Sequence, residues 1–432
     1  MDTARRFPQK PKGALISLLV FLCLGALAFY WSGAPEPTYH TLASLILSYL
    51  VLWGAIFLWS NASKVEQANR FLLTGTSIAL IVGFIELLVV AGILDFRTIL
   101  STPVREPWHH PDNLLDPKLL HIHKPHDRWL WYGIDYRYDQ YGLRNDSDLN
   151  TADVVVVGDS FVEGLGVSSA DLLTTHLAKH LNRPVANLGQ SWYGPQQELE
   201  LLRRYGLRFT PKVCVWVFFE GNDLADISRY TWATQDWETF SKDFHSFRQR
   251  SFTKNAILAL DRLFYSIHTQ KVHQDSRETE KEISGVFTSS SGHKARLYFH
   301  NKGHHLSSGD YSALEDLRSI LGQAHKLCHA ERAKFLVVFA PTKFRVYKDF
   351  VEFDPQAQPR YWVTNNLPTV IEAIVHEDLP EAGFLDLTTA LVGQALHGPL
   401  LYKDYDSHWS PEGHRVAATA IANFMSHWEK NN

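Results

Sequence analysis

Three long apolar stretches dominate the first hundred residues of the chain. They cover 14–31, 41–60 and 71–94; the first two carry no charged residue and the third carries only Glu86. Each is close to the ~20 apolar residues that a helix needs to cross ~30 Å of hydrocarbon. We therefore predict three transmembrane helices in a membrane anchor at 1–95. Because two more such stretches follow the first, we do not expect the first to be a cleaved signal peptide.

Positive charges mark one side of these predicted spans. The loop at 33–40 contains no Lys or Arg, whereas the other flanks contain Arg5, Arg6, Lys10, Lys12, Lys64 and Arg70. By the positive-inside rule the N-terminus is cytoplasmic, and three crossings place the rest of the chain outside. Intramembrane charges are often functional. No second charged residue in the spans completes a relay with Glu86, so a protonated or partner-paired carboxylate is the favoured interpretation.

Beyond residue 150, short β-branched or aromatic runs alternate with helical segments. Strands are predicted at 153–157, 184–188, 213–219, 334–340 and 383–387, and helices at 170–182, 195–206, 311–331 and 411–428. Continuous apolar runs are typical of buried parallel strands, and strands that alternate with helices form βαβ units. We therefore predict an α/β domain of three layers, with a parallel sheet between helices, within 131–432.

Two segments depart from this alternation. Residues 96–130 are rich in Pro, His and aromatic residues, and we predict a linker there with solvated histidines, because their spacing matches no metal site. These histidines are His109, His110, His121, His123 and His126. An insertion at 224–310 contains a charged run at 275–282. It is either a cap over the active-site edge or an irregular elaboration on the solvent side.

Composition excludes several classes of protein. The formal net charge is −4, and the 432 residues include three cysteines with no Cys-x-x-Cys pair. A broadly basic nucleic-acid binder and a disulfide-built scaffold are therefore excluded. We predict no nucleic-acid partner, no metal and no organic cofactor.

Four polar motifs follow predicted strands or precede the last helix. Ser160 lies in a Gly-Asp-Ser-Phe motif after the first strand, Gly189 follows the second, and Asn222 follows the third in Glu-Gly-Asn-Asp. The fourth motif, Asp-Ser-His-Trp, occupies 406–409. Active sites of open α/β sheets gather at the carboxyl ends of the strands, so we expect these residues to lie together.

These residue types predict nucleophilic catalysis. A serine hydroxyl needs a base, and His408 can take its proton while a carboxylate fixes the imidazole. Asp406, two residues before the histidine, is the predicted acid, with Asp404 as an alternative. The backbone N–H groups of Ser160 and Gly189 and the Asn222 amide would form an oxyanion hole. The other histidine near the C-terminus, His414, falls inside the last predicted helix and is a less suitable base.

The four motifs together resemble the blocks of the SGNH (GDSL-type) hydrolase superfamily. The resemblance spans roughly residues 130–430 and implies a flavodoxin-like α/β/α fold. It assigns Ser160 as nucleophile, Gly189 and Asn222 as oxyanion donors and His408 as base. In the third block Glu220 stands where the family usually has glycine.

The fourth block also departs from the usual pattern, because Tyr405 holds the position three residues before His408. The Asp406-x-His-Trp sequence instead resembles membrane-anchored bacterial members and alginate-type O-acetyltransferases. These features predict a multi-pass protein of the bacterial inner membrane with a periplasmic or extracellular catalytic domain.

The predicted activity is ester hydrolysis through an acyl-enzyme, with O-acyl or O-acetyl groups, for example on glycans, as substrates. An O-acyltransferase acting on envelope or extracellular polysaccharide would use the same residues and would need a membrane-bound partner as acyl donor. A third alternative is a non-catalytic glycan-binding protein on the same fold.

Overall fold

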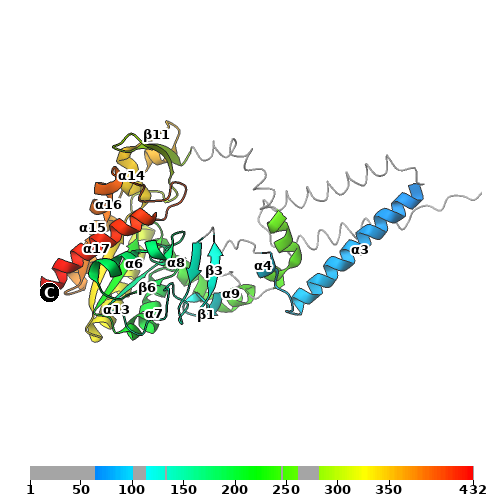
Figure 1. The fold of residues 1–432 in the computed structure, drawn as a ribbon, viewed down its shortest axis with the longest axis horizontal. Coiled ribbons are helices and arrows are strands. Elements are labelled where there is room, and N and C mark those ends of the chain that lie inside the picture. The colour runs from blue at the N-terminus through cyan, green and yellow to red at the C-terminus, as the bar shows by residue number, and fades with distance from the viewer. Residues whose placement is uncertain (1–63, 101–112, 132–133, 245–246, 261–281, 432) are drawn as a thin grey trace, which may run out of the picture. The chain divides into compact units, whose positions relative to one another are not determined.

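The computed structural model describes residues 64–100, 113–131, 134–244, 247–260 and 282–431 (Figure 1). The chain divides into two compact units. One combines Met1–Pro111 with Glu238–Val272, and the other combines Asp112–Trp237 with His273–Asn432. The predicted spans at 14–31 and 41–60 lie outside the described residues.

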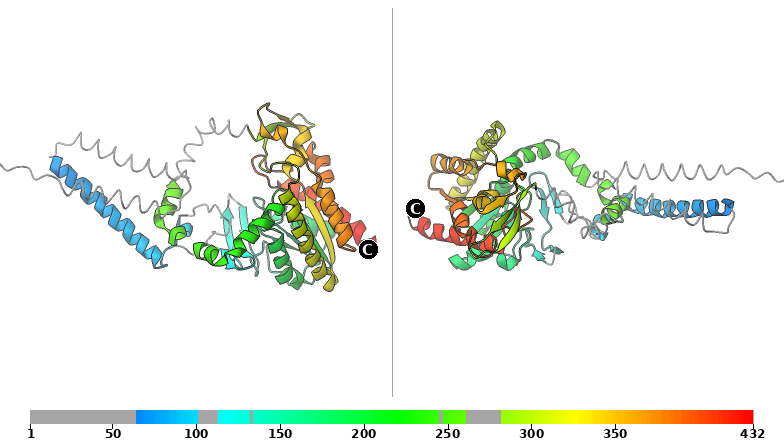
Figure 2. Two further views of the ribbon diagram at one scale, coloured as in Figure 1. Left: turned by 180° about the vertical axis from the view of Figure 1, so that it is seen from behind. Right: turned by 90° about the horizontal axis from the view of Figure 1, so that it is seen from above.

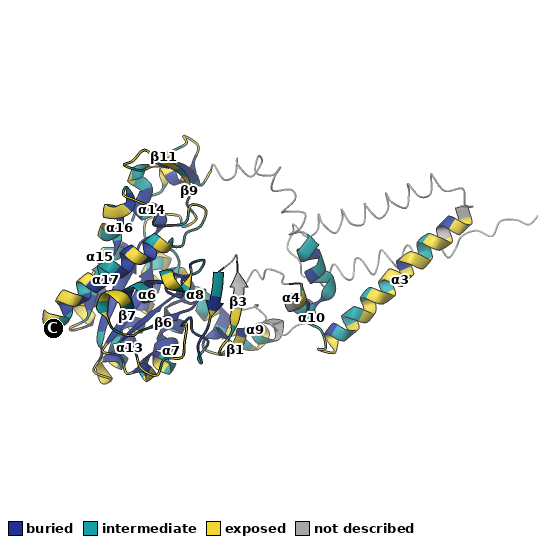
Figure 3. Ribbon diagram, viewed as in Figure 1, coloured by how far each residue is buried: buried dark blue, intermediate teal, exposed yellow. Residues whose placement is uncertain are grey.

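The first unit contains a long apolar helix, α3 (Lys64–Val90). Its segment Val65–Val90 has a mean hydropathy of 2.2 and is the one helix in the described part of the chain long and apolar enough to cross a membrane. Apolar side chains along it, such as Leu73, Leu80 and Leu87, are exposed (Figure 3). This helix covers most of the third predicted span. A short helix, α4 (Phe96–Ile99), follows it.

Glu86 of α3 binds a segment of the predicted insertion. Its Oε1 accepts hydrogen bonds from Ser251 Oγ at 2.8 Å, from the Thr253 backbone N–H at 2.7 Å and from Thr253 Oγ1 at 2.6 Å. Residues 252–260 are helical, so the carboxylate satisfies N–H groups at the start of that helix. The rings of Phe96 and Phe252 lie 4.9 Å apart. Glu86 is therefore a partner-paired carboxylate, as expected from the sequence.

The second unit is built on a five-stranded parallel sheet of order β12-β10-β7-β5-β6. The strands are β5 (Val154–Gly158), β6 (Val185–Gly189), β7 (Val213–Phe219), β10 (Lys334–Ala340) and β12 (Gly383–Asp386). The predicted positions agree to within one residue at each end. The order confirms an α/β fold with a parallel sheet and is the one found in flavodoxin-like folds.

Helices cover both faces of this sheet (Figure 2). Val155 and Val157 of β5 belong to a core shared with α7 (Pro195–Arg204), α13 (Ser308–Ala330) and α15 (Leu367–Asp378). Val154 and Val156 belong to the opposite core, shared with α6 (Leu173–Leu181), α16 (Thr388–Ala395) and α17 (Pro411–Asn431). A strand buried on both faces needs this unbroken valine run, because alternate side chains point to opposite faces.

The lead-in to the sheet consists of two hairpins. One pairs β1 (Asn113–Asp116) with β2 (Leu120–His123), and the other pairs β3 (Arg128–Trp131) with β4 (Ile134–Arg137). His121 and His123 are buried, so the expectation of solvated histidines is wrong for these two. The reason is tertiary packing: the Tyr193 hydroxyl donates to the His121 carbonyl, and Gln197 Nε2 donates to the Leu119 carbonyl at 2.9 Å.

The insertion contains regular structure at both ends. It begins with α8 (Asp223–Gln235), α9 (Trp237–Phe244) and α10 (Phe247–Arg250). Its end contributes β8 (Ser284–Thr288) and β9 (Lys294–Tyr298) to an antiparallel sheet with β11 (Val351–Phe353). Single 3-10 turns lie at Ser169–Asp171, Gly206–Phe209, Lys348–Phe350 and Gln358–Tyr361.

Candidate active site

Ser160 opens a one-turn helix, α5 (Ser160–Glu163), immediately after β5. The Asp159 side chain caps this helix by accepting from the Phe161 N–H at 2.9 Å. The turn is tight, since a Cβ at Gly158 would lie 2.5 Å from Val162 Cγ2. The turn therefore fixes Ser160 at the carboxyl end of β5, where only 9% of its surface is exposed.

Ser160, His408 and Asp406 form one hydrogen-bonded series. Ser160 Oγ lies 2.7 Å from His408 Nε2, and His408 Nδ1 lies 2.8 Å from Asp406 Oδ1. If Nδ1 carries the imidazole proton and donates it to Asp406, Nε2 is left as the acceptor for the serine hydroxyl. This arrangement is suited to removing a proton from Ser160.

The carboxyl group of Asp406 is held in its ionised form. Burial alone would raise its pKa, but the hydrogen bond from His408 and the charges of His408 and Lys403 keep the pKa well below its usual range. Lys403 Nζ lies 3.5 Å from Asp406 Oδ2. Asp404 is exposed, and its Oδ1 accepts from the Tyr405 N–H at 3.0 Å. Of the two candidate acids, Asp406 is therefore the one that contacts the histidine.

His414 has a separate position. It is buried, and its Nδ1 accepts from the backbone N–H of Leu173 at 3.1 Å. Burial lowers its pKa to about 3, so its ring is neutral. It stabilises the start of α6 rather than contacting Ser160.

Gly189 ends β6 directly beside Gly158 of β5. Its N–H donates to Asn187 Oδ1 at 2.7 Å, so this predicted oxyanion donor already has an acceptor. A Cβ at Gly189 would lie 2.0 Å from the Glu163 nitrogen and 2.4 Å from the Val162 carbonyl carbon. Close packing against α5 is therefore the structural reason for glycine at this position.

We predict that Gly189→Ala destabilises the fold and inactivates the site. The added Cβ meets backbone atoms that cannot rotate away, and overpacking of this kind costs about 1–3 kcal/mol or more. The measurement is the thermal unfolding midpoint of the full-length protein together with its esterase rate. Gly393→Ala is a matched control, because a Cβ there meets nothing within 4 Å. A Gly189→Ala protein as stable as that control would contradict the prediction.

Asn222 follows β7 and precedes α8. Its Nδ2 donates to Asp226 Oδ2 at 2.5 Å, one helical turn further on. The neighbouring Asp223 accepts from the Phe219 N–H at 2.8 Å and so closes the turn locally. Asp226 was not predicted as a site residue; its spacing of four residues from Asn222 on a helix was the available signal.

Glu220, which departs from the family pattern, has a structural partner. Arg345 of α14 (Lys343–Tyr347) donates from Nε to Glu220 Oε1 at 2.8 Å, and the Thr342 N–H donates to Oε2 at 2.9 Å. The side chains of Glu220 and Arg345 are each about 90% buried. The pair joins the segment after β7 to the segment after β10, so the glutamate supports this edge of the sheet.

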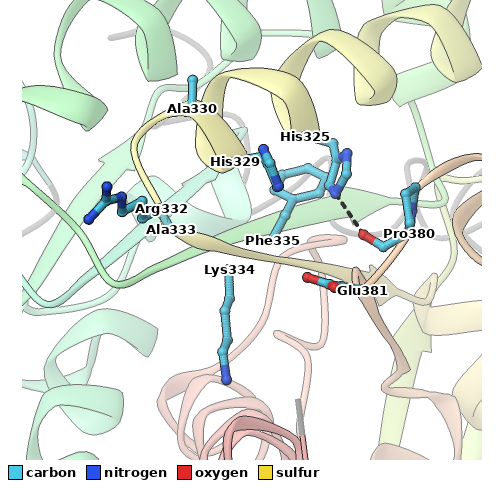
Figure 4. Close-up of a pocket in the computed structure, with 9 residues that line it drawn as sticks. All are labelled: His325, His329, Ala330, Arg332, Ala333, Lys334, Phe335, Pro380 and Glu381. Atoms are coloured by element: carbon cyan, nitrogen blue, oxygen red, sulfur yellow. Dashed lines mark hydrogen bonds between the residues drawn. The ribbon is translucent and has the colours of Figure 1, made fainter.

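The cavity in Figure 4 lies away from these residues. It has a volume of about 530 Å³ and includes Lys334 and Phe335, at the amino end of β10. His325 Nε2 lies 2.9 Å from the Pro380 carbonyl at its rim. The cavity is therefore at the opposite end of β10 from Ala340 and the candidate site. Among the described residues, no group of three or more His, Cys, Asp or Glu side chains could hold a metal ion.

A serine at the end of a parallel strand, contacted by a histidine that contacts an aspartate, defines the class of α/β serine hydrolases. The model of the GDSL-like lipase/acylhydrolase family matches residues 156–416, more than half of the chain. The chain therefore belongs to this family, and its class is that of hydrolases acting on ester bonds.

Solved structures include distant neighbours of this fold. A crystal structure of TesA is 14% identical, with a TM-score of 0.33, and the match covers 64% of this chain and 98% of that one. A carbohydrate esterase family 2 enzyme from Corynascus thermopiles (Myceliophthora fergusii) is 10% identical, with a TM-score of 0.33 and coverages of 68% and 70%.

An acetyl xylan esterase from Butyrivibrio proteoclasticus is also 10% identical, with a TM-score of 0.32 and coverages of 67% and 68%. No curated protein matches the chain. At such low similarity, the activities named for these three structures belong to those proteins.

Proposed function

We propose that this protein is a membrane-anchored serine esterase that cleaves O-acyl esters through an acyl-enzyme. The contact series from Ser160 Oγ through His408 to Asp406 Oδ1 carries this proposal. His408 takes the hydroxyl proton as Ser160 attacks the ester carbonyl, and Asp406 stabilises the resulting imidazolium. His408 then returns the proton to the leaving alcohol. A water molecule, activated by the same histidine, releases the acid.

The oxyanion of each tetrahedral intermediate needs hydrogen-bond donors. We assign the Ser160 N–H and the Asn222 amide to this role. The Gly189 N–H can join them only by leaving Asn187 Oδ1, its acceptor in this structure. No metal or cofactor takes part in these steps.

The location that we propose is the bacterial inner membrane, with three N-terminal spans and the catalytic domain on the periplasmic or extracellular side. The apolar length of α3 supports one of these spans.

The proposed substrates are O-acylated, in particular O-acetylated, glycans of the envelope. A polysaccharide hydroxyl in place of water would make the same residues an O-acyltransferase supplied by a membrane-bound donor. The Asp-x-His-Trp sequence at 406–409 favours this second candidate.

The test uses the full-length protein in detergent with p-nitrophenyl acetate, with and without polysaccharide acceptors. We expect nitrophenol release, with all of the acetyl recovered as free acetate. Acetyl recovered on the polysaccharide would instead assign the transferase. Absence of nitrophenol release, together with a Ser160 that a fluorophosphonate does not label, would contradict both enzymes and favour a glycan-binding protein.

A further inference from the structure

Four carboxylate side chains are buried together behind Asn222. They belong to Asp159, Glu198, Asp223 and Asp226, and each residue is at most 3% exposed. Burial raises the pKa of each group, and for Glu198, Asp223 and Asp226 the charges of neighbouring carboxylates add to the rise. Burial and mutual repulsion therefore oppose the charged forms of these groups, and the polar partners of each member distinguish their roles.

Asp226 has a strong polar partner on each of its two carboxyl oxygens. Arg229 Nη1 lies 2.7 Å from Oδ1, and Asn222 Nδ2 donates to Oδ2 at 2.5 Å. The contrast is Glu198, neither of whose oxygens has a hydrogen bond of normal geometry. Gly194 packs against Asp226, since a Cβ on that glycine would lie 2.7 Å from Asp226 Cβ. The position of the Asp226 carboxylate is thus fixed from several sides.

This contact determines which way the Asn222 amide faces. Asp226 Oδ2 accepts from Asn222 Nδ2, so the nitrogen end of the amide, not its oxygen, faces Asp226. Burial raises the pKa of Asp226 to about 7, and the charge of Arg229 beside Oδ1 favours the ionised form. The amide nitrogen has a second N–H. Asp226 therefore holds one N–H of the amide, and the second N–H is the donor that we assign to the oxyanion.

Arg229 connects this arrangement to the segment after β6. Its Nη2 donates to the Trp192 carbonyl at 2.7 Å, and its guanidinium lies 5.3 Å from the centre of the Trp192 ring. Trp192 follows Gly189 by three residues and has a φ of 67°, a backbone conformation that is costly for a tryptophan. Arg229 thus connects α8, which contains Asp226, to the segment after Gly189 that contains Trp192.

We propose that Asp226, held by Arg229, is a positioning residue that orients the Asn222 amide as the side-chain donor of the oxyanion hole. This role rests on the proposed esterase function. Correct orientation of the Asn222 amide is important for the oxyanion hole, because the Gly189 N–H already donates to Asn187 Oδ1. Without Asp226 the Asn222 amide can rotate freely or flip by ~180° so that its nitrogen and oxygen change places. An amide oxygen facing the oxyanion would repel the negative charge.

The test compares Asp226→Ala, Asp226→Asn and Glu198→Gln in the full-length protein in detergent, with p-nitrophenyl acetate as substrate. A misplaced oxyanion donor affects the transition state rather than substrate binding. We therefore expect Asp226→Ala to lower kcat by about 10–100-fold, less than or equal to the ~10²–10³-fold cost of removing one donor outright, with KM little changed. Asp226→Asn keeps an oxygen acceptor for the amide and should restore most of kcat. Glu198→Gln, a buried neighbour in the cluster, should resemble wild type.

A double-mutant cycle separates positioning from general loss of structure. If Asp226 acts through Asn222, adding Asp226→Ala to Asn222→Ala should lower kcat no further, whereas independent losses multiply. Wild-type kcat in Asp226→Ala, multiplying losses, or an effect mainly on KM would overturn the proposal. The rate of Ser160 labelling by a fluorophosphonate provides a second readout for all variants. Wild-type protein that neither turns over nor labels would instead show that the proposed function fails.

Discussion

Ser160→Ala is expected to reduce kcat for p-nitrophenyl acetate by at least about 10⁴-fold, because it removes the attacking oxygen itself. KM should change little, since the hydroxyl is one small group at the end of β5. The residual rate would reflect the oxyanion donors and any background attack by water. Initial rates of nitrophenol release over a range of substrate concentrations give kcat and KM separately.

A matched control removes another serine hydroxyl from the same domain. Ser168 is exposed, and its Oγ donates to Asp171 Oδ2 at 2.6 Å, so Ser168→Ala should keep the wild-type rate. Rapid acid quenching followed by intact mass measurement should show an acetyl adduct on wild-type protein that Ser160→Ala lacks. A Ser160→Ala protein that retains its rate would remove Ser160 from the mechanism and with it the esterase proposal.

The sheet could be predicted because its buried strands are recognisable as short continuous apolar runs in the sequence. A strand buried on both faces must be apolar at every buried position, and the runs at 154–158, 213–219 and 335–340 satisfy this without any tertiary information. The carboxyl-end rule then predicts that Ser160 and Asn222, which follow adjacent strands β5 and β7, lie at one edge.

The parts that could not be predicted depend on tertiary packing. Pro and His in the lead-in are typical of solvated linkers, yet Tyr193 and Gln197 from the domain bind its backbone and bury His121. Spacing alone could not decide between Asp404 and Asp406, because the decision depends on which carboxylate the loop turns toward His408. The hydrogen bond that occupies the Gly189 N–H depends likewise on the side-chain conformation of Asn187.

Asp406→Asn is expected to lower kcat by about 10³–10⁴-fold, although the side chain keeps its shape. The reason lies in the proton on the imidazole. An asparagine can present its NH₂ group to His408 Nδ1, which then acts as acceptor and leaves the proton on Nε2. Nε2 lies 2.7 Å from Ser160 Oγ and, once protonated, can no longer accept the hydroxyl proton. The loss should therefore appear in kcat, with the fold and KM preserved.

Asp404→Asn is the control that decides the acid. The Asp404 carboxylate is exposed and accepts only from the Tyr405 backbone among the hydrogen bonds of the described residues, so this variant should resemble wild type. Full activity in Asp406→Asn together with a large loss in Asp404→Asn would reverse the assignment. A further distinction comes from Lys403, which lies 3.5 Å from Asp406 Oδ2 and helps to keep that carboxyl ionised. Lys403→Met should therefore lower kcat far less than Asp406→Asn, because the His408 hydrogen bond remains and still favours the charged carboxylate.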